Sequence, residues 1–131
     1  STHSQFQKLM ELRQDGFAQS LGFEIQKQTD DEVILTLDLK SQHLNIHGYV
    51  HGGVYFSLSD IASGLMCLNV GGNWVTLDSN INYLKSTQSG RVVFHAKKLS
   101  LTRKLAVIEV SSYQDETRLT HGTFTMYLIS N

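Results

Sequence analysis

The sequence has little net charge, one cysteine and no proline. Among 131 residues, 11 Lys and Arg face 12 Asp and Glu, which leaves a formal net charge of −1. A chain so nearly neutral offers no basic field to a nucleic-acid backbone, so DNA and RNA binding are not expected. Because Cys67 is the one cysteine, it cannot form an internal disulfide, and we expect a cytoplasmic location.

The composition otherwise fits a folded protein. Apolar residues make up 40% of the chain and charged residues 18%, which argues against intrinsic disorder. The length suits one domain, so we predict a single domain over residues 1–131. Residues 1–15 mix charged and apolar side chains, which is typical of neither a signal peptide nor a membrane span, and we expect no membrane partner.

The N-terminal segment predicts a short amphipathic helix. Its apolar residues recur every three or four positions, so they would share one helical face, and the helix would end near Gly16. The residues that define this spacing are Phe6, Leu9, Met10, Arg13 and Phe17.

Alternating apolar residues predict antiparallel strands. Residues 23–39 alternate on both sides of a turn at Thr29, Asp30 and Asp31, which indicates a hairpin, and residues 41–48 have no period and indicate a loop. In the second half, short polar connections favour hairpins between successive strands. The four strands expected there are residues 75–84, 91–101, 105–113 and 119–129.

Between these strand regions, residues 54–70 predict a long helix that ends before Gly71 and Gly72. The segment is apolar nearly all round, so the helix should be buried. We therefore predict an α+β fold in which an antiparallel sheet of five to six strands wraps around a long buried helix, with a short N-terminal helix.

Asp60 is the only charged residue between Val54 and Val70. A carboxylate removed from water is costly unless it is paired, and such groups concentrate at functional sites. A water-filled seam or a structural hydrogen bond would explain Asp60 equally well.

The helix begins beside His51, Gly52 and Gly53. The first amides of a helix lack internal partners, and glycine lets a ligand oxygen come close to them, so this end could hold a developing oxyanion. Alternatively, the two glycines only permit a tight turn.

His51 and Asp60 lie nine positions apart, which is roughly 13 Å along a helix axis. One chain would not readily bring both to the same carbonyl group. If they act together, Asp60 should come from a second copy, which predicts a homodimer with sites at its interface.

At this point the sequence resembles the hotdog-fold acyl-CoA thioesterases of the PaaI-like, phenylacetate-pathway type. The resemblance covers residues 21–129, and it departs at Ser86, where many members have proline. It rests on Asn45, Gly48, His51, Gly52, Gly53, Leu58 and Asp60, followed by residues 76–84.

The resemblance implies a role for each catalytic residue. The Gly52 amide would donate to the thioester oxygen, and Asp60 of the partner chain would act as general base or as nucleophile. Asn45 would hold the carbonyl or the water, His51 would shape the loop, and Thr76 would bond the water or Asp60.

The resemblance also implies substrate contacts outside this group. Lys85, Arg103 and Lys104 could meet the phosphates of coenzyme A, although a solvated rim is the commoner role for such residues. Gly53 and Ser79 complete the predicted substrate-binding set. No metal is expected, and coenzyme A enters only as part of the substrate, because a thioester is already electrophilic and releases a good leaving group.

Two other readings of the polar residues are less favoured. His43, His47 and His51 have the spacing of metal ligands on a helix, yet the composition around Gly48 is that of a loop. The serines around Asp60 lack the Gly-x-Ser-x-Gly pattern of serine hydrolases. Trp74 and Tyr83 read most simply as core or interface residues.

The predicted function is therefore hydrolysis of an acyl-CoA by a homo-oligomer, which the resemblance suggests is a tetramer of two dimers. A hotdog-fold enoyl-CoA hydratase or dehydratase is one alternative. A non-catalytic acyl-CoA binding or sensor protein is the other, although a sensor has no need of a desolvated base. The acyl group itself is not readable from the sequence.

Overall fold

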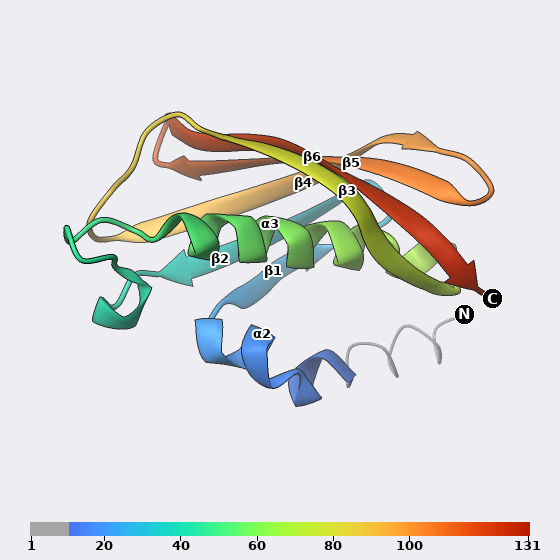
Figure 1. The fold of residues 1–131 in the computed structure, drawn as a ribbon, viewed down its shortest axis with the longest axis horizontal. Helices are drawn as coiled ribbons and strands as arrows, with labels where there is room; N and C mark the ends of the chain where they lie inside the picture. Colours follow the sequence, from blue (N-terminus) through green and yellow to red (C-terminus); the bar gives the residue numbers. More distant parts are fainter. Residues whose placement is uncertain (1–10) are drawn as a thin grey trace.

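A computed structural model describes residues 11–131 as an antiparallel sheet curled around one long helix (Figure 1). Two short 3-10 turns, Ser41–His43 and Leu68–Val70, flank that helix in the chain. The elements in order are α2 (Gly16–Leu21), β1 (Glu24–Gln28), β2 (Glu32–Asp38), α3 (Gly52–Met66), β3 (Asn73–Tyr83), β4 (Arg91–Leu101), β5 (Leu105–Gln114) and β6 (Thr117–Ser130). The predicted α+β class and hotdog architecture are confirmed.

The sheet has six strands in the order β1-β2-β4-β5-β6-β3, and all of its pairs are antiparallel. Three pairs join strands that follow each other in the chain, as predicted. The prediction is wrong for β3, which pairs with β6 instead of β4. The connection over residues 84–90 carries the chain across the sheet, because β3 occupies the edge beside the long helix (Figure 1).

The core lies between α3 and the concave face of the sheet. Inward residues of the central strands, such as Phe94, Ile108 and Phe124, are fully buried. They meet a helix face that includes Leu58 and Ala62, which are also inaccessible to solvent. Burial of this apolar surface is the main force that holds the helix in the curl of the sheet.

The prediction that α3 is buried on all sides is only half right. A ridge of residues four positions apart, Gly52, Phe56, Asp60 and Gly64, is half-buried or exposed, because residues at this spacing share one helix face. The regular helix also ends at Met66, earlier than expected. By length and composition Gly52–Val70 could cross a membrane, yet half of it is buried as a core helix.

The N-terminal helix differs from the prediction. Phe6, Leu9 and Met10 lie outside the described residues. Residues 11–14 are helical, and Asp15 then starts α2 by accepting the Ala18 N–H at 3.1 Å. A helix therefore begins at Gly16, where one was predicted to end. Phe17, expected on the packed face, is 63% exposed, because the new helix buries Ala18 and Leu21 instead.

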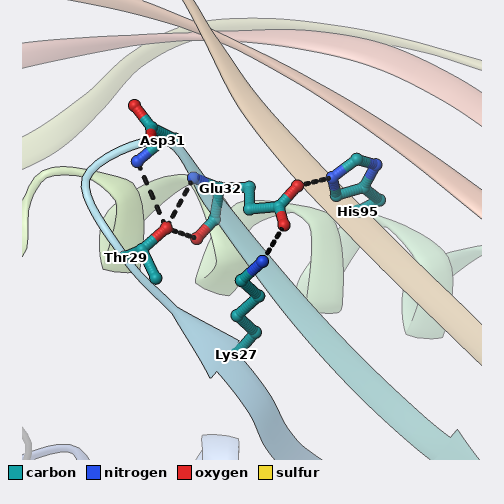
Figure 2. A network of polar contacts seen from close by, with 5 residues as sticks. All are labelled: Lys27, Thr29, Asp31, Glu32 and His95. Carbon is teal, nitrogen blue, oxygen red and sulfur yellow. Dashed lines mark hydrogen bonds and ion pairs between the residues drawn. The ribbon is translucent and has the colours of Figure 1, made fainter.

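The first hairpin follows its prediction, and polar contacts fix its turn (Figure 2). The hydroxyl of Thr29 accepts the N–H groups of Asp31 and Glu32 at 3.3 and 3.2 Å, as serine and threonine commonly do in turns. The carboxylate of Glu32 then joins three strands, since it bonds Lys27 at 2.5 Å and His95 at 2.7 Å.

Candidate active site

The uncovered ridge of α3 runs beside edge strand β3. Near one end of the ridge, Tyr83 donates its hydroxyl to the Gly52 carbonyl at 3.2 Å. Two turns further along, Thr76 donates its hydroxyl to Oδ1 of Asp60 at 2.5 Å. Helix and strand therefore run in opposite directions, and two contacts tie the strand to the face that carries the predicted site residues.

Asp60 is half-buried and faces a hollow of about 550 Å³. We call this the Asp60 hollow. Its floor comes from α3, its walls come from β3, the end of β6 and the segment over residues 11–15, and most of its lining is apolar. It is lined by Glu11, Leu12, Asp15, Asp60, Ile61, Gly64, Leu65, Cys67, Leu68, Gly72, Asn73, Trp74, Val75, Thr76, Met126 and Ile129.

A second hollow of about 540 Å³ lies at the start of α3, and we call it the Gly52 hollow. The loop before the helix, the end of β3 and the connection after it enclose this space. It is lined by Asn45, His47, Tyr49, Val50, Gly52, Tyr55, Tyr83, Leu84, Lys85 and Ser86. Within one chain, Asp60 therefore opens on one hollow, and Asn45 and Gly52 open on another.

At the start of α3, one backbone N–H group is already hydrogen-bonded by a side chain. Nδ1 of His51 accepts the Gly53 N–H at 3.0 Å, so His51 is the N-cap of the helix. Within the described part of the chain, the Gly52 N–H makes no hydrogen bond, and the ring of Tyr83 lies 3.5 Å from the position that a Cβ on Gly52 would take. The Gly52 amide is thus the donor that remains for a ligand.

Asn45 shapes the loop that precedes the helix. Its side-chain oxygen accepts the N–H groups of His47 and Tyr49 at 2.9 and 3.1 Å, which is the geometry of an Asx turn. The Asn45 oxygen is therefore used by the loop, and the side-chain NH₂ is the group that can serve a ligand in the Gly52 hollow.

The predicted cations do not gather at one place in a single chain. Lys85 lines the Gly52 hollow, and its N–H bonds the Leu119 carbonyl at 3.1 Å. Lys104 instead accepts the Leu128 N–H at 2.9 Å, in the same turn as Arg103. The two anchor points, Leu119 and Leu128, lie nine positions apart on β6, which corresponds to about 30 Å along the strand.

Ser79 is also removed from both hollows. It lies in the middle of β3, where its N–H bonds the side chain of Asp78 at 2.9 Å and its backbone pairs with Phe124. Of the predicted site residues, the structure places five around the two hollows, namely Asn45, Gly52, Asp60, Thr76 and Lys85.

The histidines of the loop do not form a metal site. His43 is buried, and both of its ring nitrogens contact backbone groups, of Lys40 at 2.9 Å and of Leu21 at 2.7 Å. Across residues 11–131, no group of three metal-ligating side chains is present. Ser63 donates its hydroxyl to the Ser59 carbonyl inside α3 at 2.8 Å, so this hydroxyl serves the helix. The buried hydroxyl of Ser59 has no hydrogen-bond partner among the described residues.

Sequence reasoning missed the tyrosines that line the Gly52 hollow, which are Tyr49, Tyr55 and Tyr83. Tyr55 and Tyr83 contact each other edge to face, with ring centroids 6.2 Å apart. Burial raises the pKa of the Tyr55 hydroxyl above that of a free phenol. No local pattern could have placed Tyr83 here, because it lies 31 positions after Gly52 and reaches it only through the sheet.

The edge of the sheet beside the ridge is open. β3 is the last strand in the order, so one of its sides has no strand partner within the described chain. Most of its residues are exposed, including Val75 at 43% and Leu77 at 61%, and Tyr83 is exposed at 52%. An edge strand with such apolar side chains is a ready surface for pairing with another strand.

Comparison with known proteins gives the family context of this arrangement. Residues 47–121 match the model of the thioesterase superfamily. Mouse acyl-coenzyme A thioesterase 13 is 27% identical over 103 residues, which cover 75% of this chain and 74% of that protein.

Two solved structures with coenzyme A compounds share the fold. A hypothetical thioesterase of Streptococcus pneumoniae with coenzyme A is 32% identical, with a TM-score of 0.79 over 83% of this chain and 90% of that one. A Streptococcus mutans protein bound to acetyl CoA has the same identity, coverage and TM-score. The pneumococcal protein was also solved with one aspartate or one threonine replaced by alanine, at positions separated by the same 16 residues as Asp60 and Thr76.

Proposed function

Because this chain belongs to the thioesterase superfamily and is a thioester hydrolase, we propose that two copies of it hydrolyse an acyl-CoA at a site they share. The similarity to an acyl-coenzyme A thioesterase and to structures with coenzyme A or acetyl CoA supports the substrate class. Asp60 and Thr76 would act from one copy, and Asn45 and Gly52 from the other.

The separation of the two hollows carries this proposal. Asp60 and Gly52 lie two turns apart on one ridge and open on different spaces. If two copies pair through their β3 edges about a two-fold axis, the strands are antiparallel and the two α3 helices are antiparallel as well. The Gly52 of each copy then approaches the Asp60 of the other, and two equivalent sites form.

In this arrangement the thioester carbonyl lies between a base and an oxyanion donor. The Asp60 carboxylate takes a proton from water, whose oxygen bonds to the carbonyl carbon. The Gly52 N–H of the partner subunit and the Asn45 side-chain NH₂ of that subunit bond the resulting oxyanion, and the positive end of the helix dipole adds to its stability. When the carbon–sulfur bond breaks, the thiolate accepts the proton, which yields free acid and CoA.

A second route uses the same residues. Asp60 attacks the carbonyl carbon directly and forms a mixed anhydride, and water then hydrolyses that intermediate. Thr76 supports either route, because its hydrogen bond to Oδ1 orients the carboxylate and directs Oδ2 at the reacting atom. A single turnover in ¹⁸O water identifies the second route when label appears in Asp60, since this requires that the anhydride forms and that water opens it at the Asp60 carbonyl. Neither route needs a metal, because the thiolate is a good leaving group.

We also propose a tetramer of two such dimers in the cytoplasm, with coenzyme A held at its phosphates by cations from both copies. Lys85 of one copy and the Arg103 and Lys104 turn of the partner are the residues we assign to this role. Light scattering at micromolar concentration tests the oligomer, and an active monomer would contradict the shared site.

The proposed reaction is tested by thiol release. The purified protein should release CoA thiol from a panel of short, medium, long and aryl acyl-CoA esters. A parallel assay follows hydration of crotonyl-CoA. Tight binding of acyl-CoA without thiol release would favour a binding protein, and hydration without release would favour a hydratase, so either result would overturn the proposal.

A further inference from the structure

Gly64 is an unexplained glycine in the last turn of α3, two residues before the helix ends at Met66. Glycine within a helix is less favourable than alanine, because it loses more backbone freedom on folding. Such a residue is usually required by a positive φ or by a close neighbour. Gly64 has neither, since its φ is outside the positive range and a Cβ built on it would meet nothing within 4 Å.

The empty space beside Gly64 belongs to the Asp60 hollow. Gly64 follows Asp60 by four positions, so the two share one face of α3, about 6 Å apart along the axis. Because Cβ atoms lean toward the N-terminus of a helix, a side chain at position 64 would extend into the space next to the Asp60 carboxylate. The glycine therefore keeps open the part of the hollow nearest to the proposed reacting atoms.

The lining of this space indicates what it can hold. Leu65, Trp74 and Met126 present apolar surface, and the volume of about 550 Å³ is within the range of pockets that take small-molecule ligands. Glu11 and Asp15 also line the hollow and carry negative charge. An uncharged apolar acyl group would be favoured there, and an acyl group that carries a free carboxylate would be repelled.

We infer that Gly64 sets the size of the acyl group, and that the substrates are CoA esters of uncharged apolar acids larger than acetate. This inference rests on the proposed function and extends it. The acyl chain would lie in the Asp60 hollow, past the carboxylate that acts on its carbonyl. The missing side chain at position 64 would provide the room for the first carbons of the chain.

The test is a chain-length profile of three variants. Gly64→Ala and Gly64→Leu fill the space in two steps, and both residues are good helix formers, so α3 should remain intact. Gly16→Ala is the matched control, because a Cβ there also meets nothing within 4 Å, but Gly16 lines neither hollow. The value of kcat/KM is measured for acetyl-, butyryl-, hexanoyl- and octanoyl-CoA.

For Gly64→Leu, the ratio of kcat/KM for octanoyl-CoA to that for acetyl-CoA should fall about 10-fold or more. A change of a few methylene groups in an apolar pocket commonly produces discrimination of this magnitude. Gly64→Ala should shift the ratio in the same direction by less, with a melting temperature at or above that of the wild type. Gly16→Ala should leave the ratio unchanged. If Gly64→Leu does not fold, the Gly64→Ala ratio decides.

Three results would overturn the inference, and they are distinguishable. An unchanged ratio in the Gly64 variants, with thiol release intact, would refute the role of Gly64 and leave the proposed function standing. Dissociation of the oligomer by Gly64→Ala would show that the glycine serves subunit packing. Absence of thiol release from every ester, in wild type and variants alike, would refute the proposed function as well.

Discussion

The hydroxyl of Thr76 donates a 2.5 Å hydrogen bond to Oδ1 of Asp60 and so joins edge strand β3 to the uncovered ridge of α3. The bond gives the half-buried carboxylate a fixed orientation. It also means that the position of β3 in the sheet decides where the carboxylate of Asp60, the proposed base, points.

Replacement of Thr76 by valine should lower kcat about 10-fold, because valine keeps the shape of threonine and removes the donor that orients Asp60. Thr76→Ser retains the hydroxyl and is the matched control, with kcat expected near that of the wild type. KM should change little in either variant. Equal kcat values for the valine and serine variants would show that the hydrogen bond has no part in the reaction.

Gly122 tests the placement of β3. A Cβ at this position of β6 would lie 2.7 Å from the Asn80 carbonyl oxygen, which belongs to the backbone of β3. Gly122→Ala should therefore force the strands apart and lower the stability by about 1–3 kcal/mol, as overpacking commonly does. Urea unfolding measures the change, with Gly64→Ala as a control in open space. A Gly122→Ala variant of wild-type stability would show that β3 lies elsewhere.

Acid should weaken the hairpin network of Figure 2. The hydrogen bond from Lys27, and a second one from His95, lower the pKa of Glu32 from 4.5 to about 2. A carboxyl with a lowered pKa stabilises the fold fully above its unfolded value, and this contribution is lost as the pH falls toward the folded value. Between pH 5 and pH 2, the melting temperature should thus fall less for Glu32→Gln than for the wild type.

Glu116→Gln, on the turn between β5 and β6, is the control for that comparison. It should follow the wild-type curve, because its turn lies outside the network. Parallel curves for the wild type and Glu32→Gln would show that the ion pairs of Glu32 contribute nothing measurable. Low salt is required, since exposed pairs are screened.

Replacement of the cations assigned to coenzyme A should raise KM and leave kcat unchanged. Lys85→Ala and the double variant Arg103→Ala, Lys104→Ala should each raise KM for an acyl-CoA, because each removes positive charge from the phosphates. The same acyl group on pantetheine, which lacks the adenosine phosphates, should show no such change. A matching rise in KM for both esters would contradict phosphate binding by these residues.

Much of the fold was predictable because burial leaves a period in the sequence. The alternation in β2 and β4 identified these strands nearly to their ends, and the apolar segment over residues 54–70 located α3, although the regular helix ends earlier, at Met66. The pairing of β3 with β6 was not predictable, because short connections favour pairing between strands that follow each other in the chain. The break at Asp15 was missed because apolar spacing continues across it, while the cap is a local polar contact.

The candidate site was predictable in its types of residue and not in its geometry. Asp60 stood out as the one charge in an apolar segment, and the paired glycines marked a helix start. The sequence could not say which amide is available, because that depends on the ring of His51 accepting the Gly53 N–H. Nor could it show that Gly64 faces the same hollow as Asp60.

The most direct test of the shared site is complementation between two inactive variants. Asp60→Asn removes the base, and Asn45→Asp keeps the loop-bonding oxygen and removes the NH₂ donor. Each variant alone should lose about 100-fold or more of the thioesterase activity, which is a common loss for positioned acid–base groups. Both chains are then co-expressed with different tags, and the mixed oligomer is purified.

In a mixed dimer, one site carries both changes and the other carries neither. Thiol release by the purified mixed dimer should therefore recover to about half of the wild-type rate, because one of its two sites is intact. If both residues act within one chain, every site retains a defect. Activity of the mixed protein no higher than that of either variant would contradict the account.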